Sequence, residues 1–313
     1  MKSMTQLNFE ENLLTKAAWY YYKDHLTQQE IASLLHISRN KVVRLLERAR
    51  TEGIVTFHIK GTGLHCLSME RELVKAFHLI DAFIIPTPKE NLSDSLGKAA
   101  AQYLETHLQN GDLLGIGWGE TISRTLENIN FDSSMNISIV TLTGGVNYYL
   151  PKKQNYLNQV HGQLHIIPSP FLASTNEMAN SILSEPSVKD ILHVASFANT
   201  AVVGIGGLSP DATILKEEKM TLREMTCIRN QNGVGDILGQ FYNIHGDILN
   251  LSHHKRLIGT PLSILRNMKH VVGVAGGRQK VDAIYGALKG RYIHTLIIDE
   301  ETALSLLKKE SEV

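Results

Sequence analysis

Residues 26–59 read LTQQEIASLLHISRNKVVRLLERARTEGIVTFHI and contain two helix starts separated by a short turn. Thr27 can cap a first helix, and Glu30 three residues later can complete a capping box with it. Ser38 can cap a second helix after the turn at residues 36–37. Apolar residues at helical spacing are Ile31, Leu34 and Leu35 in the first helix and Val42, Val43, Leu45, Leu46 and Ala49 in the second. Gly53 is placed to end the second helix, and residues 54–59 alternate like the strand of a small wing. This order predicts a winged helix-turn-helix.

Basic residues are concentrated on the second of these helices. Residues 36–50 contain five Lys or Arg against one Glu, a balance of five minus one or +4, whereas the whole chain has 31 basic and 31 acidic residues. A basic helix on a neutral chain concentrates phosphate affinity in one place. The alternative is an amphipathic helix whose charges only keep it soluble, but caps, turn and wing occur together and in order. The residues predicted to bind DNA are Thr27, Gln28, Ser38, Arg39, Asn40, Lys41, Arg44 and Arg48.

Length and composition predict more than one domain. The 313 residues are 43% hydrophobic, which is typical of a globular protein with a sizeable core. Two cysteines, Cys66 and Cys227, favour a reducing compartment, and neither a signal peptide nor an apolar run of ~20 residues is evident. We therefore expect a cytoplasmic protein that has no membrane partner. The predicted domains are a DNA-binding domain (1–60), a linker and connecting helix (61–79), and an effector and oligomerisation domain (80–313).

The third predicted region alternates apolar strands with helices. Candidate strands occupy residues 81–86, 112–119, 137–145, 164–170, 200–207, 271–277 and 294–300, and candidate helices occupy 93–108, 280–290 and 302–309. Near-continuous apolar strands that end in glycine and lead into helices indicate a Rossmann-like α/β fold, with a parallel sheet covered on both faces. Ligands of such sheets bind outside the carboxyl ends of the strands.

Four of these strand ends are rich in glycine, at residues 117–119, 143–145, 204–207 and 273–277. Glycine permits close backbone approach, and free N–H groups at a helix start favour phosphate. Neither a GxGxxG fingerprint nor a GxxxxGK[ST] loop is present. Each loop by itself can be only a tight turn. Several such loops on one sheet edge nevertheless favour a site for a small phosphorylated ligand.

Two polar residues near these loops are candidates for ligand binding. Asp236 lies in the apolar run GVGDILG, and Lys280 follows the last glycine loop at the start of a helix. The alternatives are a buried Asp236 satisfied by backbone amides and a solvated Lys280. His253 and His254 lack a neighbouring Cys, Asp or Glu at metal spacing, and GxSxG and HExxH are absent. We therefore expect neither a metal nor another cofactor.

Several stretches together resemble the SorC family of sugar-sensing bacterial transcription regulators. They are WYYYKDHLTQQEIASLLHISRNKVVRLLERARTEGIV, GIGWGET, TLTGG, VGIGG, GVGDILGQFY and VVGVAGGRQKVDAIYGALKGRYIHTLIID, and the resemblance extends over residues 13–307. It implies an effector domain similar to sugar-phosphate isomerases but without enzymatic activity. It also implies a homo-oligomer, a tetramer, in which the effector changes affinity for operator double-stranded DNA.

The resemblance further implies roles for individual residues. Gly119, Glu120 and Thr121, with Thr143, Gly144 and Gly145, should form phosphate- and hydroxyl-binding loops, and Asp236 and Lys280 should bind ligand hydroxyl or carbonyl groups. Gly206 belongs to the same expected site, and Trp118 should close one wall. Gly117 also belongs to the expected site, at a position where many members of that family have Ser. The effector expected is phospho-autoinducer-2, the alternative a phosphorylated pentose or hexitol. The rival function is a sugar-phosphate isomerase or lyase in which Asp236 and Lys280 act as acid and base.

Overall fold

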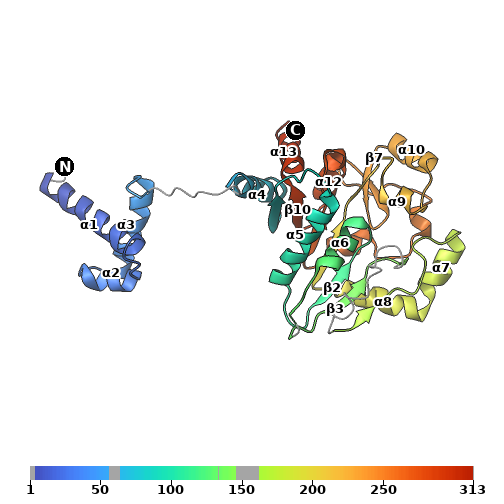
Figure 1. Ribbon diagram of the computed structural model, residues 1–313, viewed down its shortest axis with the longest axis horizontal. Coiled ribbons are helices and arrows are strands. Elements are labelled where there is room, and N and C mark those ends of the chain that lie inside the picture. The colour runs from blue at the N-terminus through green and yellow to red at the C-terminus, as the bar shows by residue number, and fades with distance from the viewer. Residues whose placement is uncertain (1–3, 56–63, 133, 146–161, 313) are drawn as a thin grey trace. The chain divides into compact units, whose positions relative to one another are not determined.

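The computed structural model describes residues 4–55, 64–132, 134–145 and 162–312. The chain forms two compact units, residues 1–62 and 63–313 (Figure 1). The division falls just before the helix that the sequence assigned to a connecting segment. That helix therefore belongs to the second unit.

The described part of the first unit contains three helices around a small apolar core. They are α1 (Met4–Tyr22), α2 (Gln28–Leu34) and α3 (Arg39–Thr51). The buried side chains are Leu14, Ala17, Ala18, Ile31, Ala32, Val42, Leu45, Leu46 and Ala49. Leu34 and Val43, expected in the apolar stripes, are instead 54% and 40% exposed. The buried residues of α3 (Val42, Leu45, Leu46 and Ala49) follow the i, i+3, i+4, i+7 spacing of one helix face, and Val43 lies to one side of that face. Ile54 and Val55 form no strand, and the rest of the expected wing, residues 56–59, lies outside the described residues.

The predicted caps are present at both helix starts. Thr27 and Glu30 form a reciprocal capping box, in which the Glu30 N–H donates to Thr27 Oγ1 (3.3 Å) and the Thr27 N–H to Glu30 Oε2 (2.8 Å). At the second helix, the Lys41 N–H donates to Ser38 Oγ (3.3 Å). His36 between the helices has φ 52°, the left-handed conformation that turns the chain sharply. The sequence thus sets where both helices begin.

Thr27→Ala is expected to loosen α2, because a lost N-cap costs ~0.5–2 kcal/mol. Amides of residues 31–34 should exchange with solvent faster by roughly two- to thirty-fold, as measured by hydrogen exchange of the full chain. Thr221→Ala removes a matched capping box with Glu224 in the second unit and serves as the control. Unchanged exchange in α2 of the Thr27 variant, with faster exchange at α10 (Leu222–Asn230) of the control, would contradict this prediction.

The second unit is built on a seven-stranded parallel sheet in the order β1-β10-β9-β5-β2-β3-β4. The strands are β1 (Asp81–Ile85), β2 (Leu113–Ile116), β3 (Ser138–Thr141), β4 (Leu164–His165), β5 (Thr200–Gly204), β9 (Val271–Val274) and β10 (Thr295–Asp299). Each of the seven predicted strand segments contributes one of these strands. The parallel α/β fold predicted from the sequence is confirmed.

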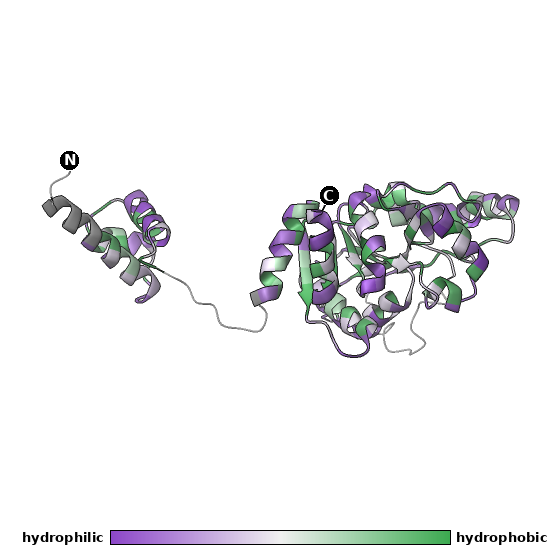
Figure 2. Ribbon diagram, turned by 90° about the horizontal axis from the view of Figure 1, so that it is seen from above, coloured by the Kyte–Doolittle hydropathy of each residue, from purple (hydrophilic) through white to green (hydrophobic). Residues whose placement is uncertain are grey.

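Helices cover both faces of this sheet. They are α4 (Leu64–Phe77), α5 (Leu92–His107), α6 (Glu120–Asn128), α7 (Asn176–Ser184), α8 (Pro186–Ser196), α9 (Thr213–Lys216), α10 (Leu222–Asn230), α11 (Leu262–Arg266), α12 (Val281–Lys289) and α13 (Glu300–Ser311), with short 3₁₀ turns η3 (His254–Arg256) and η4 (Arg278–Lys280). Polar residues lie mainly on the outer faces of the helices (Figure 2).

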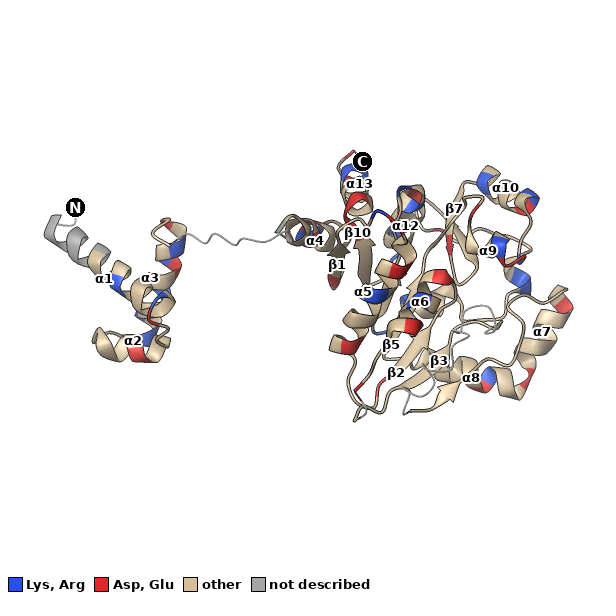
Figure 3. Cartoon of the chain, viewed as in Figure 1, with Lys and Arg blue, Asp and Glu red and all other residues tan. Residues whose placement is uncertain are grey.

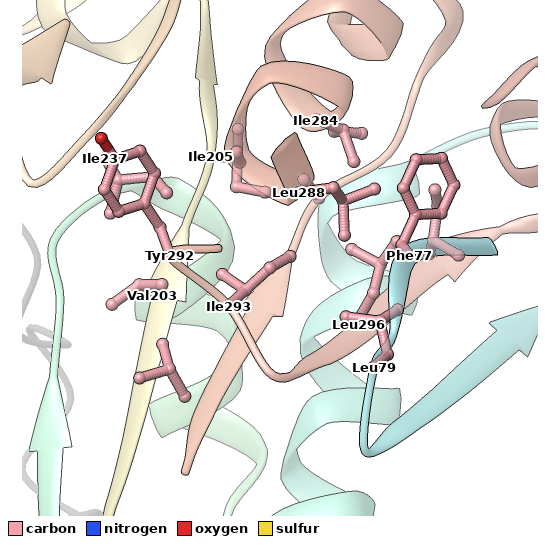
Figure 4. Close-up of a cluster of buried hydrophobic side chains, with 14 of the residues drawn as sticks. Phe77, Leu79, Val203, Ile205, Ile237, Ile284, Leu288, Tyr292, Ile293 and Leu296 are labelled. Carbon is pink, nitrogen blue, oxygen red and sulfur yellow. The ribbon is translucent and has the colours of Figure 1, made fainter. Parts of the chain in front are cut away.

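Two hydrophobic cores lie on opposite faces of the sheet. Successive residues of β10 divide between them: Leu296 and Ile298 belong to one core, and Ile297 to the other. This follows from the two-residue period of a strand. Figure 4 shows the first core, where Phe77 of α4 and Leu288 of α12 lie near Leu296. Because α4 contributes buried residues to this core, it is an integral part of the second unit.

A small antiparallel sheet was not predicted as such. It consists of β6 (Gly206–Gly207), β7 (Gly233–Ile237) and β8 (Gln240–Asn243), in the order β6-β7-β8. Gly206 pairs with Asp236 across it. This pairing brings two of the predicted effector residues together.

Candidate functional site

The first candidate site is the basic surface of α3. Arg39, Asn40, Lys41, Arg44 and Arg48 are all exposed on this helix, and Figure 3 shows Lys and Arg along it. In a helix-turn-helix, the start of the second helix approaches base edges. The arrangement therefore presents two cationic side chains and one amide where base contacts are made.

Neighbouring groups distinguish the basic residues from one another. Arg39 Nη2 donates to Gln28 Oε1 (3.3 Å), which ties the starts of α2 and α3 together. Arg48 Nε forms an ion pair with Glu52 Oε1 (2.9 Å) at the end of α3. Binding a DNA phosphate would require Arg48 to exchange this partner, so we expect a smaller contribution from Arg48 than from Arg44.

The second candidate site is a cavity of about 550 Å³ in the second unit. It lies at the carboxyl ends of β2, β5 and β9, near the point where the strand order of the sheet reverses. Predicted effector residues that line it are Trp118, Gly119, Glu120, Thr121, Gly206, Asp236 and Lys280. The fold brings these residues together from four separate segments of the chain.

Two of the helices that cover the sheet, α5 and α6, begin at this cavity. Gly119, with φ 119°, precedes α6, and Asn91, with the left-handed φ of 54°, precedes α5. Gly119 has no side chain that could cap α6, and the Asn91 side chain makes no cap hydrogen bond to α5. The first N–H groups of a helix have no intrahelical acceptor, and the helix dipole there favours an anion. Both helix starts can therefore donate hydrogen bonds to a phosphate in the cavity.

Asp236 is the buried acid of the cavity, with only 4% of the residue exposed. Burial raises the pKa of Asp236 to about 6, against the opposing influence of the Gly239 N–H, which donates to Oδ2 (3.0 Å), and of the Lys280 charge. A Cβ on Gly206 would lie 2.0 Å from Asp236 Oδ1. Glycine at position 206 thus leaves room for the carboxylate directly above the backbone of β6.

Lys280 provides the cation opposite this acid. Burial lowers the pKa of Lys280, while the carboxylates of Asp236, Glu120 and Asp211 raise it. A Cβ on Gly207 would lie 3.2 Å from Lys280 Cγ, so the side chain runs along the glycine strand. An acid and a cation that approach the same small cavity can bind the hydroxyl or carbonyl groups of a polar ligand.

Some predicted effector residues do not line the cavity. Gly117 lies behind it, where an added Cβ would be 3.1 Å from Leu238 Cδ2 and 3.2 Å from Val203 Cα. The loop Thr143–Gly145 is packed elsewhere. The Gly144 N–H donates to Ile258 O (2.9 Å) and the Gly145 N–H to Ser169 O (2.8 Å). These amides already have acceptors, so this loop does not supply cavity phosphate donors in the present arrangement.

Other residues at the cavity were missed by sequence reasoning. They are Asn91, Leu92, Ser93, Asp94, Leu96, Arg124, Ser209, Asp211, Ala212, Thr213, Ile214, Lys216 and Gln279. The segment NLSD at 91–94 carries a signal, since Asn before a helical stretch is typical of a helix start. Residues 209–216 follow the predicted strand at 200–207 but offer no periodic pattern. Trp118 lines the cavity and packs against Phe171, with ring centroids 4.5 Å apart.

The raised pKa of Asp236 gives a test in the absence of ligand. The folded protein binds the Asp236 proton more tightly than the unfolded chain does. Protonated Asp236 therefore stabilises the fold below the unfolded pKa of 3.8, and this stabilisation is lost as the pH rises through the folded pKa of about 6. Relative to Asp236→Asn, the wild type should therefore lose roughly 2–3 kcal/mol of unfolding free energy between pH 4 and 7. Urea denaturation at several pH values measures this difference. A wild-type and variant difference that is constant over this range would contradict the burial-raised pKa.

Within the described ranges, no cluster of three or more His, Cys, Asp or Glu residues could hold a metal ion. The same ranges contain no helix long and apolar enough to cross a membrane.

Comparison with known proteins gives a consistent result. A family model described as "Putative sugar-binding domain" matches residues 63–308. The chain is 38% identical over 305 residues to the transcriptional regulator LsrR of Enterobacter sp. (strain 638), with 95% of this chain and 93% of that protein covered. It is 39% identical over 306 residues to the transcriptional regulator LsrR of Escherichia coli (strain K12), with coverage of 96% and 95%.

Solved structures show the same architecture. The full-length sorbitol operon regulator SorC from Klebsiella pneumoniae matches with a TM-score of 0.73 and 28% identity, over 95% of this chain and 98% of that chain. A DeoR family transcriptional regulator from Listeria monocytogenes matches with a TM-score of 0.71 over 77% of this chain and 98% of that chain. Its 23% identity supports the fold alone.

Proposed function

The chain belongs to the SorC family of sugar-binding transcriptional regulators, and we propose that a phosphorylated sugar-like effector in the cavity controls its binding to operator DNA. The relatives are named as regulators, and the chain is a regulator and not the sugar-phosphate isomerase or lyase considered as the rival. The proposal thus concerns the ligand, the residues that bind it and the direction of the response.

The observation that carries the proposal is the combination of groups at one cavity. Two helix starts offer N–H groups for a phosphate, and Asp236 and Lys280 face the rest of the same space. We assign phosphate binding to Gly119–Thr121 together with Asn91 and Ser93. Asp236 accepts a hydrogen bond from a ligand hydroxyl, and Lys280 donates one to a carbonyl or hydroxyl oxygen. Gly206 lets the ligand approach Asp236, and Trp118 limits the size of the ligand.

Phospho-autoinducer-2 is the effector that we propose. The support is the similarity to LsrR over almost the full length of the chain. The cavity volume of about 550 Å³ is also large enough for a small phosphorylated molecule. A phosphorylated pentose or hexitol fits the same set of donors and acceptors and is the alternative.

The proposed response is release from DNA by a cytoplasmic homotetramer that acts as a repressor. An effector that binds one arrangement of the oligomer more tightly must change operator affinity by the same coupling factor. The DNA-binding residues proposed are Thr27, Gln28, Ser38, Arg39, Asn40, Lys41, Arg44 and Arg48, all at the surface formed by the starts of α2 and α3 or along α3.

A thermal-shift panel tests the choice of effector. Phospho-autoinducer-2, ribose 5-phosphate, glucitol 6-phosphate and inorganic phosphate are each added to the full chain. A ligand at ~100 times its Kd should stabilise the protein by about 2.7 kcal/mol. The proposal is supported if phospho-autoinducer-2 stabilises the protein at a lower concentration than the other ligands do. If another sugar phosphate stabilises it at a lower concentration than phospho-autoinducer-2 does, that sugar phosphate is the effector instead. If none of the sugar phosphates stabilises the chain more than inorganic phosphate does, the proposed cavity ligand class is wrong.

A further inference from the structure

A buried acid next to the cavity is not explained by ligand binding. Asp299, 1% exposed, ends β10 and precedes α13. Its carboxylate accepts four hydrogen bonds, from Thr87 Oγ1 (3.1 Å), the Gly277 N–H (2.9 Å), Thr302 Oγ1 (2.7 Å) and the Thr302 N–H (3.2 Å). Capping α13 requires only a bond to the first turn of that helix. The bonds to Thr87 and Gly277 therefore serve another purpose. We call Thr87, Gly277, Asp299 and Thr302 the Asp299 junction.

Two loops held by the junction lead directly into the cavity. Thr87 lies in the connection from β1 to α5, whose start at residues 91–94 lines the cavity. Gly277 lies in the turn after β9, and the Lys280 N–H donates to Gly277 O (2.9 Å). A Cβ on Gly276 would lie 2.2 Å from Asp299 Oδ1, so the backbone of this turn rests against the carboxylate. The hydrogen bonds to Asp299 therefore hold two segments in place at the end of β10: the turn that precedes Lys280 and the loop that precedes α5.

The other side of the junction reaches the start of α4. Glu300, the residue after Asp299, places its Oε1 3.1 Å from Nδ1 of His65, in the first turn of α4. The Glu301 N–H donates to Thr87 Oγ1 (2.9 Å), so the first turn of α13 is bonded to the cavity loop as well. The boundary between the two units falls immediately before α4, at residues 62 and 63. The first turn of α13 therefore contacts the cavity loops and the beginning of the helix that follows the DNA-binding unit.

We propose that Asp299 is a positioning residue that couples the cavity loops to the first turn of α4 through Glu300 and His65. A ligand that draws Lys280 and the start of α5 together moves the donors to Asp299, and the first turn of α13 moves with them. The inference rests on the proposed function for the identity of the ligand, but the mechanical connection is a property of the chain alone.

Hydrogen exchange of the full chain without effector tests the connection. Asp299→Asn should increase amide exchange by at least threefold in three segments at once: residues 86–94, 276–281 and 64–70. Asp282→Asn is the matched control, because Asp282 is an exposed acid in the first turn of α12 that pairs with Lys309 (3.1 Å). Thr87→Val removes both the donor to Asp299 and the acceptor of the Glu301 N–H. This second variant should affect residues 86–94 and 64–70 in the same direction. Changes confined to the first turn of α13 in both junction variants would overturn the proposal.

A second measurement tests the coupling to DNA. Glu300→Gln leaves the cavity residues intact, so the Kd for phospho-autoinducer-2 without DNA should stay within twofold of the wild type. The ratio of operator Kd values with and without saturating phospho-autoinducer-2 should fall at least threefold. Glu312→Gln, at the other end of α13, is the control. An unchanged ratio in Glu300→Gln overturns the transmission through His65. A wild type that responds to no sugar phosphate overturns the proposed function instead, and the exchange measurement still decides on the junction.

Discussion

Replacing Lys280 with methionine is expected to raise the effector concentration needed to release operator DNA by roughly ten- to hundred-fold. Methionine keeps the length and apolar stem of the side chain but removes the ammonium that faces Asp236, Glu120 and Asp211 across the cavity. A hydrogen bond to a charged group contributes ~1.5–3 kcal/mol, which corresponds to a roughly ten- to hundred-fold loss of effector affinity. Operator affinity without effector should remain within twofold, because Lys280 belongs to the second unit and makes no contribution to α3. Asp236→Ala should behave in the same way.

A gel-shift titration with phospho-autoinducer-2 at fixed operator and protein concentrations measures this effect. Lys189→Met is the matched control, since Lys189 is exposed on α8 and does not line the cavity. If the Lys280 and Asp236 variants both release operator DNA at the wild-type effector concentration, the effector binds elsewhere. Loss of operator binding without effector would instead indicate that the variants disturb the fold.

The largest effect on DNA binding is expected from Arg39 and Lys41 at the start of α3. Arg39→Ala and Lys41→Ala should each weaken operator binding by ~1–3 kcal/mol and relax the preference for the base pair that each side chain contacts. The double variant should lose most of the discrimination between operator and unrelated DNA. Arg44→Ala should weaken binding to all sequences alike and reduce the dependence of log K on log salt by about 0.9. Arg48→Ala should have less effect, because Arg48 is paired with Glu52 in the free protein.

Fluorescence anisotropy with operator and scrambled duplexes at three salt concentrations separates these cases. Lys16→Ala on α1 removes the same charge from an exposed position outside α2 and α3 and serves as the control. Equal loss of operator and scrambled binding in the Arg39 and Lys41 variants would show that they contact only phosphates. Unchanged operator affinity in all four α3 variants would contradict the assignment of α3 as the recognition helix.

The sequence predicted that glycine-rich strand ends form the cavity, but it did not predict which of these strand ends contribute residues to it. The loops at 117–119, 204–207 and 273–277 each contribute residues to the cavity, whereas the loop at 143–145 does not. All four look alike in the sequence. The loop at 143–145 differs in that its N–H groups donate to Ile258 O and Ser169 O, distant in the sequence, which hold it against segments outside the cavity. Such long-range pairing leaves no local signature.

By itself, the sequence determined the starts of α2 and α3, the basic surface of α3, and the positions of all seven parallel strands. These features depend on local physics: side-chain caps act over three residues, and an apolar run of strand length has to be buried on both faces. Tertiary structure alone decided which side chains meet. It paired Gly206 with Asp236, placed Lys280 opposite that acid, and put Asp299 against two cavity loops and Glu300 against the start of α4. These contacts join segments that are tens to hundreds of residues apart in the chain. Only the assembly of the seven-stranded and three-stranded sheets brings them together.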